Sequence, residues 1–249
     1  WDQLDRWYYS ISEAVLDENV RAEHKAFELV GPEDSAVDKL RKLYESIVLE
    51  LPYQTISFDY DASIPHTPDE VLVNRWGDCK DKGHLLIRML RSVGMEAWPV
   101  LVMTRSDGYS LPIPYFGFNH LIVGTVVDGD TLYVDPTSTP FAPEQSIGDW
   151  VAGQPCLNVT GRGELLSRLP GPGPNATDLK WELALSSRDD GQYGFTMNRE
   201  WKNLSAGQVR EDYRDVTPQG SCRDKEAYFA DAWGVTLKIA SLIFDSPRS

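Results

Sequence analysis

The chain has 249 residues, of which 41% are hydrophobic and 25% charged, a composition ordinary for a folded protein and unlike that of a disordered chain. Its formal net charge of −14 argues against binding to nucleic acid, because the phosphate backbone would be repelled. No apolar run in the sequence approaches the roughly 18 residues of a transmembrane helix, so we also expect no membrane insertion.

The first part of the chain is predicted to be helical. Apolar positions recur at helical spacing over residues 1–27 and again over residues 35–49, and Pro52 follows the second of these helices. Residues 53–67 are expected to be extended, and residues 70–72 to form a short helical turn.

A longer helix is predicted to begin at Cys79 and to end at Gly94, with apolar residues at every third or fourth position between them. The start of a helix carries unpaired backbone N–H groups, whose partial positive charge favours a thiolate. Cys79 is therefore a candidate nucleophile. Lys80 and Lys82 either add positive charge beside it or, as flexible surface side chains, only solvate the turn.

The pattern then changes to that of β-strands, with a hairpin turn at Asp128-Gly129. The aromatic side chains between the first two strands, in residues 105–118, either cover the core or line a cleft. The predicted strands are residues 97–103, 119–127 and 131–135.

Two polar residues mark the ends of the hairpin strands. His120 opens one strand and Asp135 closes the next, so the two are expected to be near cross-strand partners. A cysteine nucleophile needs a base, and the base needs an acceptor that orients its ring. We therefore predict a catalytic triad of Cys79, His120 and Asp135.

The last third of the chain is predicted to be a second unit. Residues 170–174 are rich in proline and glycine and suit a domain boundary. We divide the chain into a core at residues 1–170 and a β-rich C-terminal module at residues 171–249, which is expected to be incomplete. In this module we predict strands at residues 180–185, 193–201 and 235–244, and a helix at residues 204–213.

Each chemical residue also has a plain structural interpretation, because free cysteines and single histidines are often core groups. The three cysteines, Cys79, Cys156 and Cys222, cannot form a disulfide framework, and none lies at zinc-binding spacing. His84 follows Cys79 by five positions and is poorly placed for a shared metal. We predict neither a metal site nor a cofactor.

Three separated motifs resemble one family. They are Gly77-Asp78-Cys79-Lys80-Asp81-Lys82, Phe118-Asn119-His120-Leu121-Ile122-Val123 and Tyr133-Val134-Asp135-Pro136-Thr137. They are similar to the nucleophile, histidine and aspartate motifs of the bacterial transglutaminase-like superfamily, in the same order along the chain. The chain further resembles a subgroup whose core lies between two β-rich domains.

The resemblance implies an α+β class with a papain-like core, in which the nucleophile helix packs on an antiparallel sheet. It also implies acyl transfer from an amide or thioester donor to an amine, through a thioester on Cys79, giving an amide bond or a crosslink. Two alternatives stay open: a cysteine peptidase or amidase that uses water, and a non-catalytic peptide-binding module. The aromatic loop of residues 105–118 favours transfer, since it would exclude water.

Further site residues are expected around this centre. Tyr53 or Gln54 is a candidate donor to the oxyanion beside the backbone N–H of Cys79. The candidate substrate-binding residues are Trp76, Tyr115, Phe116 and Asn119.

The expected partner is a peptide, a protein or an acyl-carrier-bound substrate. The subgroup resemblance and the glycosylation sequons at Asn158, Asn175 and Asn203 favour a location outside the cytoplasm, either periplasmic or secreted.

Overall fold

The computed structural model describes residues 1–54, 64–104, 117–138, 147, 151–171, 177–187, 193–202, 223 and 226. The helices are α1 (Asp2–Leu16), α2 (Val20–Leu29), α3 (Ala36–Glu50), α4 (Pro68–Asn74) and α5 (Cys79–Ser92). The strands are β1 (Ala97–Val102), β2 (His120–Val127), β3 (Asp130–Val134), β4 (Pro155–Asn158), β5 (Ser167–Arg168), β6 (Thr177–Ser187) and β7 (Tyr193–Lys202).

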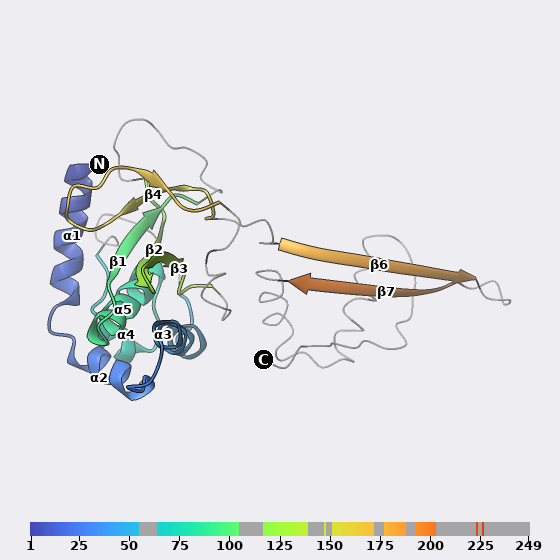
Figure 1. Ribbon diagram of the computed structural model, residues 1–249, viewed down its shortest axis with the longest axis horizontal. Helices are drawn as coiled ribbons and strands as arrows, with labels where there is room; N and C mark the ends of the chain where they lie inside the picture. Colours follow the sequence, from blue (N-terminus) through green and yellow to red (C-terminus); the bar gives the residue numbers. More distant parts are fainter. Residues whose placement is uncertain are drawn as a thin grey trace.

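A five-stranded antiparallel sheet in the order β3-β2-β1-β4-β5 forms the centre of the core. Figure 1 shows α5 beside β1 and β2, and β6 and β7 as a separate two-stranded sheet. Close packing explains a glycine within α5, because a Cβ on Gly83 would lie 2.4 Å from the side chain of Leu121 in β2. The α+β class predicted from the sequence is confirmed.

The hydrophobic core lies between α5, the helices around it and one face of the sheet. Apolar residues at helical spacing on α5 are fully buried there, as the periodicity of the sequence predicted. They pack with Leu40, Leu43 and Ile47 of α3 and with Val123 and Val134 of the hairpin.

The first predicted helix is wrong in one respect, since residues 1–27 form two helices rather than one. The break follows from Asn19, whose side-chain amide donates to the carbonyl oxygens of Val15 (2.8 Å) and Asp17 (2.7 Å). Glu18 has a positive φ of 52°, which no α-helix accommodates. A short polar side chain that caps carbonyls locally thus ends α1, although the apolar periodicity continues.

The other helix starts follow from side-chain caps. Ser35 accepts a hydrogen bond from the backbone N–H of Asp38 at the start of α3. Thr67 and Glu70 form a reciprocal capping box at the start of α4, so the short helical turn predicted at residues 70–72 is a helix of seven residues.

In the C-terminal region β6 and β7 pair from Asp178 opposite Lys202 to Ser187 opposite Tyr193. The two strands predicted there are confirmed, and β6 is longer than expected. The predicted helix at residues 204–213 and strand at residues 235–244 lie outside the described residues, as does most of the linker. The division into two domains stays a prediction.

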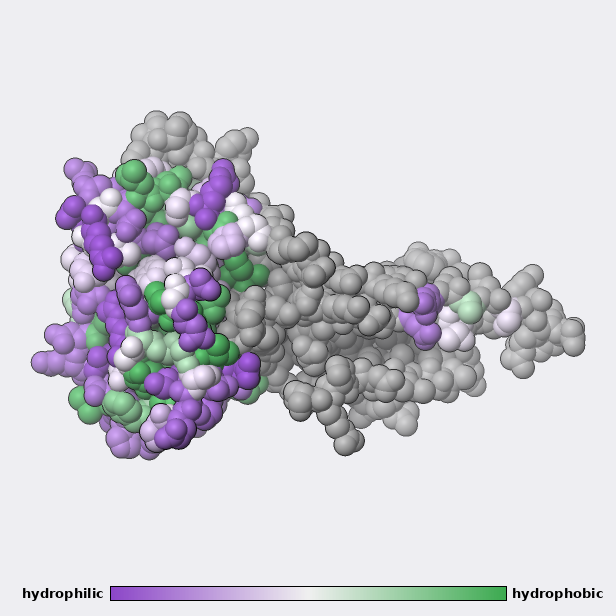
Figure 2. Space-filling model, in the orientation of Figure 1, coloured by the Kyte–Doolittle hydropathy of each residue, from purple (hydrophilic) through white to green (hydrophobic). Residues whose placement is uncertain are grey.

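The surface of the core drawn in Figure 2 is mainly hydrophilic, with small separated apolar areas. Within the described part of the chain, no helix is both long and apolar enough to span a membrane.

Candidate active site

Cys79 is the first residue of α5, as the sequence predicted. The carboxylate of Asp78 accepts hydrogen bonds from the backbone N–H groups of Lys80 (3.0 Å) and Asp81 (3.1 Å), and Asp81 accepts from the backbone N–H of Asp78 in return (3.1 Å). This capping box fixes the start of the helix at the cysteine. Only 2% of the surface of Cys79 is exposed, so the helix dipole acts on its sulfur with little screening by water.

His120 and Asp135 form a hydrogen-bonded pair, with 2.9 Å between Nε2 and Oδ2. The other carboxylate oxygen accepts from the backbone N–H (3.0 Å) and the hydroxyl (2.7 Å) of Thr137. The hydroxyl of Tyr44 donates to the backbone carbonyl of Asp135 at 2.8 Å. Asp135 is fully buried, and these contacts hold its carboxylate in one orientation toward the histidine.

The register of the hairpin is the one that a turn at Asp128-Gly129 predicts, and it makes His120 and Asp135 near partners. Asp128 and Gly129 have positive φ values of 52° and 92°, as a two-residue hairpin turn requires, and they centre the pairing so that Val123 lies opposite Val134. Asp135 therefore follows the last paired residue and is a diagonal neighbour of His120, not its direct partner. The two side chains bridge this diagonal, which lies within reach of long side chains.

The surroundings of His120 favour its protonated form. Burial lowers the pKa of His120, but the charge and hydrogen bond of Asp135 together with a hydrogen bond to Cys79 raise it to about 10. Burial likewise raises the pKa of Asp135, but His120 and Thr137 hold it below its usual range. Because Nε2 is engaged by Asp135, Nδ1 is the ring nitrogen left to face Cys79.

The interpretation of Lys80 and Lys82 as surface side chains is wrong, since only 2% of each is exposed. Lys80 forms an ion pair with Asp78. Lys82 Nζ donates to the carbonyl oxygen of Leu51 at 2.9 Å, directly after the end of α3. Burial lowers the pKa of Lys82 to about 8, against the opposing influence of the Asp135 carboxylate.

The segment that carries the candidate oxyanion donors lies beside the turn before Cys79. Tyr53 and Gly77 form a parallel β-bridge, and the backbone N–H of Gln54 donates to the Gly77 carbonyl at 3.2 Å. A Cβ on Gly77 would lie 2.8 Å from Cβ of Asp81 and 3.4 Å from Cγ of Lys82, so only glycine fits here without a shift. The structure thus brings Tyr53 and Gln54 to the nucleophile turn.

The structure describes two of the four candidate substrate-binding residues, Trp76 and Asn119. The ring of Trp76 meets that of His66 edge-on, with centroids 5.5 Å apart, just before the nucleophile turn. Asn119 accepts from the backbone N–H of Thr104 (2.9 Å) and donates to its hydroxyl (2.8 Å), so it joins the segments flanking β1 and β2. Tyr115 and Phe116 lie outside the described residues.

Sequence reasoning did not foresee the contacts through which Tyr44, Lys82 and Thr137 hold the site together. Thr137 had a local signal, since an aspartate side chain commonly accepts a hydrogen bond from the backbone N–H two residues on. The hydroxyl of Tyr44 binds a carbonyl 91 residues away, a contact with no signature in the sequence.

Three other features considered in the sequence were possible metal ligands, Cys156 and the sequon at Asn158. In the described part of the chain no cluster of three or more His, Cys, Asp or Glu residues is arranged to hold a metal. Cys156 is buried, lies 3.2 Å from the hydroxyl of Ser167, and has its pKa raised by burial. Asn158, one of the three sequon positions, uses its side chain within the fold, where it accepts from the indole of Trp98 at 2.8 Å.

A helix that begins at a cysteine and packs on an antiparallel sheet with a histidine–aspartate pair is the arrangement of papain-like cysteine enzymes. Residues 23–129 match the model of the Transglutaminase-like superfamily. The resemblance to this superfamily, predicted from the sequence, is therefore confirmed for residues 23–129, and the match supports a cysteine enzyme as the class of protein. None of the curated proteins matches the sequence.

Two solved structures are similar to this chain. A putative protease from Parabacteroides distasonis ATCC 8503 superimposes with a TM-score of 0.51 and 15% identity, over 65% of this chain and 30% of that one. A putative cysteine protease from Cytophaga hutchinsonii has a TM-score of 0.38 and 14% identity, over 74% of this chain and 51% of that one. The chain thus spans about 30% of the Parabacteroides protein, with which it shares the fold.

Proposed function

We propose that this protein is a cysteine acyltransferase, which forms an amide bond by way of a thioester on Cys79. The observation that best supports this proposal is the buried constellation itself. Cys79 lies at the start of α5 and hydrogen-bonds to His120, whose far nitrogen is held by Asp135 at 2.9 Å. These are the relative positions that a nucleophile, its base and an orienting carboxylate require.

In the first half of the reaction the Cys79 thiolate attacks the carbonyl carbon of an amide or thioester donor. The bond from that carbon to nitrogen or sulfur breaks, and the imidazolium of His120 gives its proton to the leaving amine or thiol. Asp135 keeps the ring in the required orientation. The backbone N–H of Cys79, together with Tyr53 or Gln54, is proposed to bind the oxyanion.

In the second half an amine attacks the thioester. His120 accepts the proton that the amine loses, the new amide leaves, and the Cys79 thiolate is restored. Low exposure supports an amine over water as the acceptor, because Cys79, His120 and Asp135 are 2%, 5% and 0% exposed. The proposed donors are peptides, proteins or acyl-carrier thioesters, with the protein acting outside the cytoplasm.

Hydrolysis by the same residues is the second candidate, and it differs only in the acceptor. It is favoured by the shared fold with the Parabacteroides protein that is described as a putative protease. A non-catalytic peptide-binding module, the third alternative, would need none of the thiol chemistry.

Thiol labelling tests the nucleophile first. Wild-type protein, Cys79→Ala and Cys156→Ala are treated with iodoacetamide at about pH 6, where an ordinary thiol is unreactive, and the label is assigned by intact mass and peptide mapping. Cys156 is the matched control because it too is buried. We expect labelling at Cys79 in the wild type and in Cys156→Ala. An inert Cys79 would instead favour the binding module.

The acceptor is then identified with a glutamine-containing peptide and an alkyl thioester as donors. Each is incubated with the wild type and with Cys79→Ala, with and without a primary amine such as glycinamide. A new amide product that needs both Cys79 and the amine supports transfer. Release of the free acid at the same rate with and without the amine supports hydrolysis and contradicts the proposal.

A further inference from the structure

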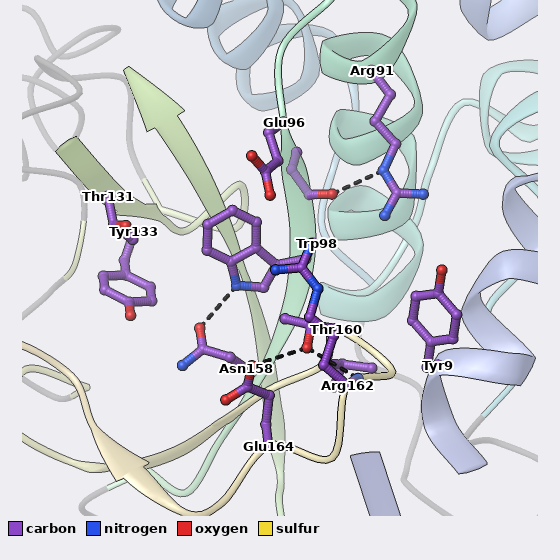
Figure 3. A pocket seen from close by; sticks show the side chains of 12 residues that line it. Tyr9, Arg91, Glu96, Trp98, Thr131, Tyr133, Asn158, Thr160, Arg162 and Glu164 are labelled. Carbon is purple, nitrogen blue, oxygen red and sulfur yellow. Dashed lines mark hydrogen bonds between the residues drawn. The ribbon is translucent and has the colours of Figure 1, made fainter. Parts of the chain in front are cut away.

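A cavity of about 520 Å³ lies at the end of the core sheet away from His120, between α1, α5, β1, β3 and the segment after β4 (Figure 3). Along β2, His120 lies opposite Val102, whereas Gly124 lies opposite Trp98, which lines the cavity. Four strand positions separate the His120–Val102 pair from the Gly124–Trp98 pair, a distance of about 13 Å. The cavity is therefore distinct from the proposed catalytic site.

Between these two residue pairs, other side chains cover the same face of the sheet. Val100 and Ile122, which pair with each other, are fully buried and pack with Val151 and Leu169. Segments that follow β3 and β5 thus cover the middle of the face and leave its far end open. A ligand in the cavity would not reach Cys79 across this cover.

The floor of the cavity is an aromatic platform. A Cβ on Gly124 would lie 2.6 Å from two atoms of the Trp98 indole, so the ring lies directly over the glycine. The indole N–H donates to the side-chain oxygen of Asn158 at 2.8 Å, which fixes the ring in its plane. Tyr133 is paired with Gly124 on the other side and borders the same cavity. One indole face rests on the sheet, and Trp98 is only partly buried.

The rim carries equal numbers of acidic and basic side chains. Figure 3 shows Glu96 above Trp98 and Glu164 below it. Arg91 lies on the same side as Tyr9, and Arg162 lies in front of the indole. Arg91 is bound by Glu13 at 2.9 Å and by the Ala97 carbonyl at 2.8 Å. Within the described residues, the exposed side chains of Glu96 and Arg162 have no hydrogen bond or ion pair.

The mixture of acidic and basic side chains on the rim favours one chemical class of ligand. An anion would meet Glu96 and Glu164, and a cation would meet Arg91 and Arg162, so a neutral ligand is favoured. Hydroxyl groups both donate and accept, and they can use acidic, basic and amide partners at once. The C–H face of a pyranose ring stacks on an indole as other flat apolar surfaces do. We propose that this cavity binds a neutral saccharide stacked on Trp98, independently of the chemistry at Cys79.

The test is isothermal titration of the full chain with two neutral probes, cellohexaose and the hexamer of N-acetylglucosamine. We expect saturable binding of at least one, with Kd on the order of 10⁻⁴ to 10⁻³ M. Trp98→Ala is expected to weaken binding at least tenfold. Because that ring is partly buried, the exposed Arg162→Ala serves as a second variant, for which we expect about threefold weaker binding and an unchanged Tm.

Two controls make the result specific. Trp7→Ala removes an indole that is 43% exposed on α1, outside the cavity lining, and should bind as the wild type does. Cys79→Ala should also bind normally. The proposal is overturned if neither neutral probe binds at about 10 mM, if folded Trp98→Ala binds as tightly as the wild type, or if an oligogalacturonate or a glucosamine hexamer binds more tightly than both neutral probes.

Discussion

The two halves of α5 are buried to the same extent but consist of opposite kinds of residue. In the first turn Asp78, Lys80, Asp81 and Lys82 are at most 2% exposed, and in the following turns residues 85–87, 89 and 90 are at most 1% exposed. Burial alone therefore does not distinguish a stabilising segment from a functional one. The distinction depends on what each buried side chain contacts.

In the polar half every buried charge has a specific partner. Lys80 pairs with Asp78, Lys82 binds the carbonyl of Leu51, and Asp81 accepts from the backbone N–H groups of Asp78 and His66. Buried ion pairs contribute little net stability, because desolvation offsets their attraction. We infer that this half is maintained for the geometry around Cys79, whereas the apolar half stabilises the fold.

The strongest way to separate the two halves is to remove the proposed nucleophile. Cys79→Ala should lower acyl transfer at least 10⁴-fold, equal to more than about 5 kcal/mol of transition-state stabilisation, and leave Tm within a few degrees. Cys156→Ala, the buried control, should keep its activity. Product formation by mass spectrometry measures the first effect, and a variant that retains a tenth of the wild-type rate would contradict the assignment.

The apolar half should show the opposite behaviour. Leu86→Ala removes a fully buried side chain from the core and should lower the free energy of unfolding by about 3 kcal/mol. Urea denaturation measures this change. Val73→Ala, at a position 58% exposed on α4, is the matched control and should change stability by less than about 0.5 kcal/mol. Equal losses in both variants would show that α5 is not central to the core.

Substitution of Lys82 is expected to lower both the catalytic rate and the stability of the fold. Lys82→Met leaves the Leu51 carbonyl without its donor and frees the segment that carries Tyr53 and Gln54, so we expect about tenfold lower kcat and about 1–2 kcal/mol lower stability. Lys42→Met removes a surface ion pair with Asp34 and should change neither quantity measurably. A fall in stability with kcat unchanged would limit Lys82 to a structural role.

The last contrast concerns two buried histidines whose pKa values shift in opposite directions. Burial lowers the pKa of His84 to about 4, and its ring nitrogens contact the Lys80 carbonyl (2.7 Å) and the Ser12 hydroxyl (3.0 Å). The unfolded chain binds a proton there near pH 6.5, so stability should fall as pH drops from about 6.5 toward 4. For His120, with a pKa near 10, the contribution is complete below about pH 6.5 and is lost as pH rises toward 10.

Urea midpoints between pH 4.5 and 9.5 test this contrast, with differences on the order of 2 to 4 kcal/mol. His84→Gln should flatten the acid side of the profile, and His120→Gln the alkaline side. If both variants flatten the same side, the opposite shifts are wrong.

Much of this arrangement was predictable from local sequence. The start of α5 at Cys79 and the turn at Asp128-Gly129 depend on residues within a few positions of each other, and the structure contains both. The single helix expected over residues 1–27 failed because the periodicity of apolar residues gives no weight to one capping side chain, Asn19.

The sequence by itself determined the helix that begins at the cysteine and the hairpin that brings His120 near Asp135, because each depends on short-range spacing. Only the tertiary structure decided that Tyr44 and Lys82 hold this site, since their partners lie 91 and 31 residues away. Contacts between distant segments leave no periodic pattern along a chain, and a lysine has the same local appearance whether it is solvated or buried against a carbonyl.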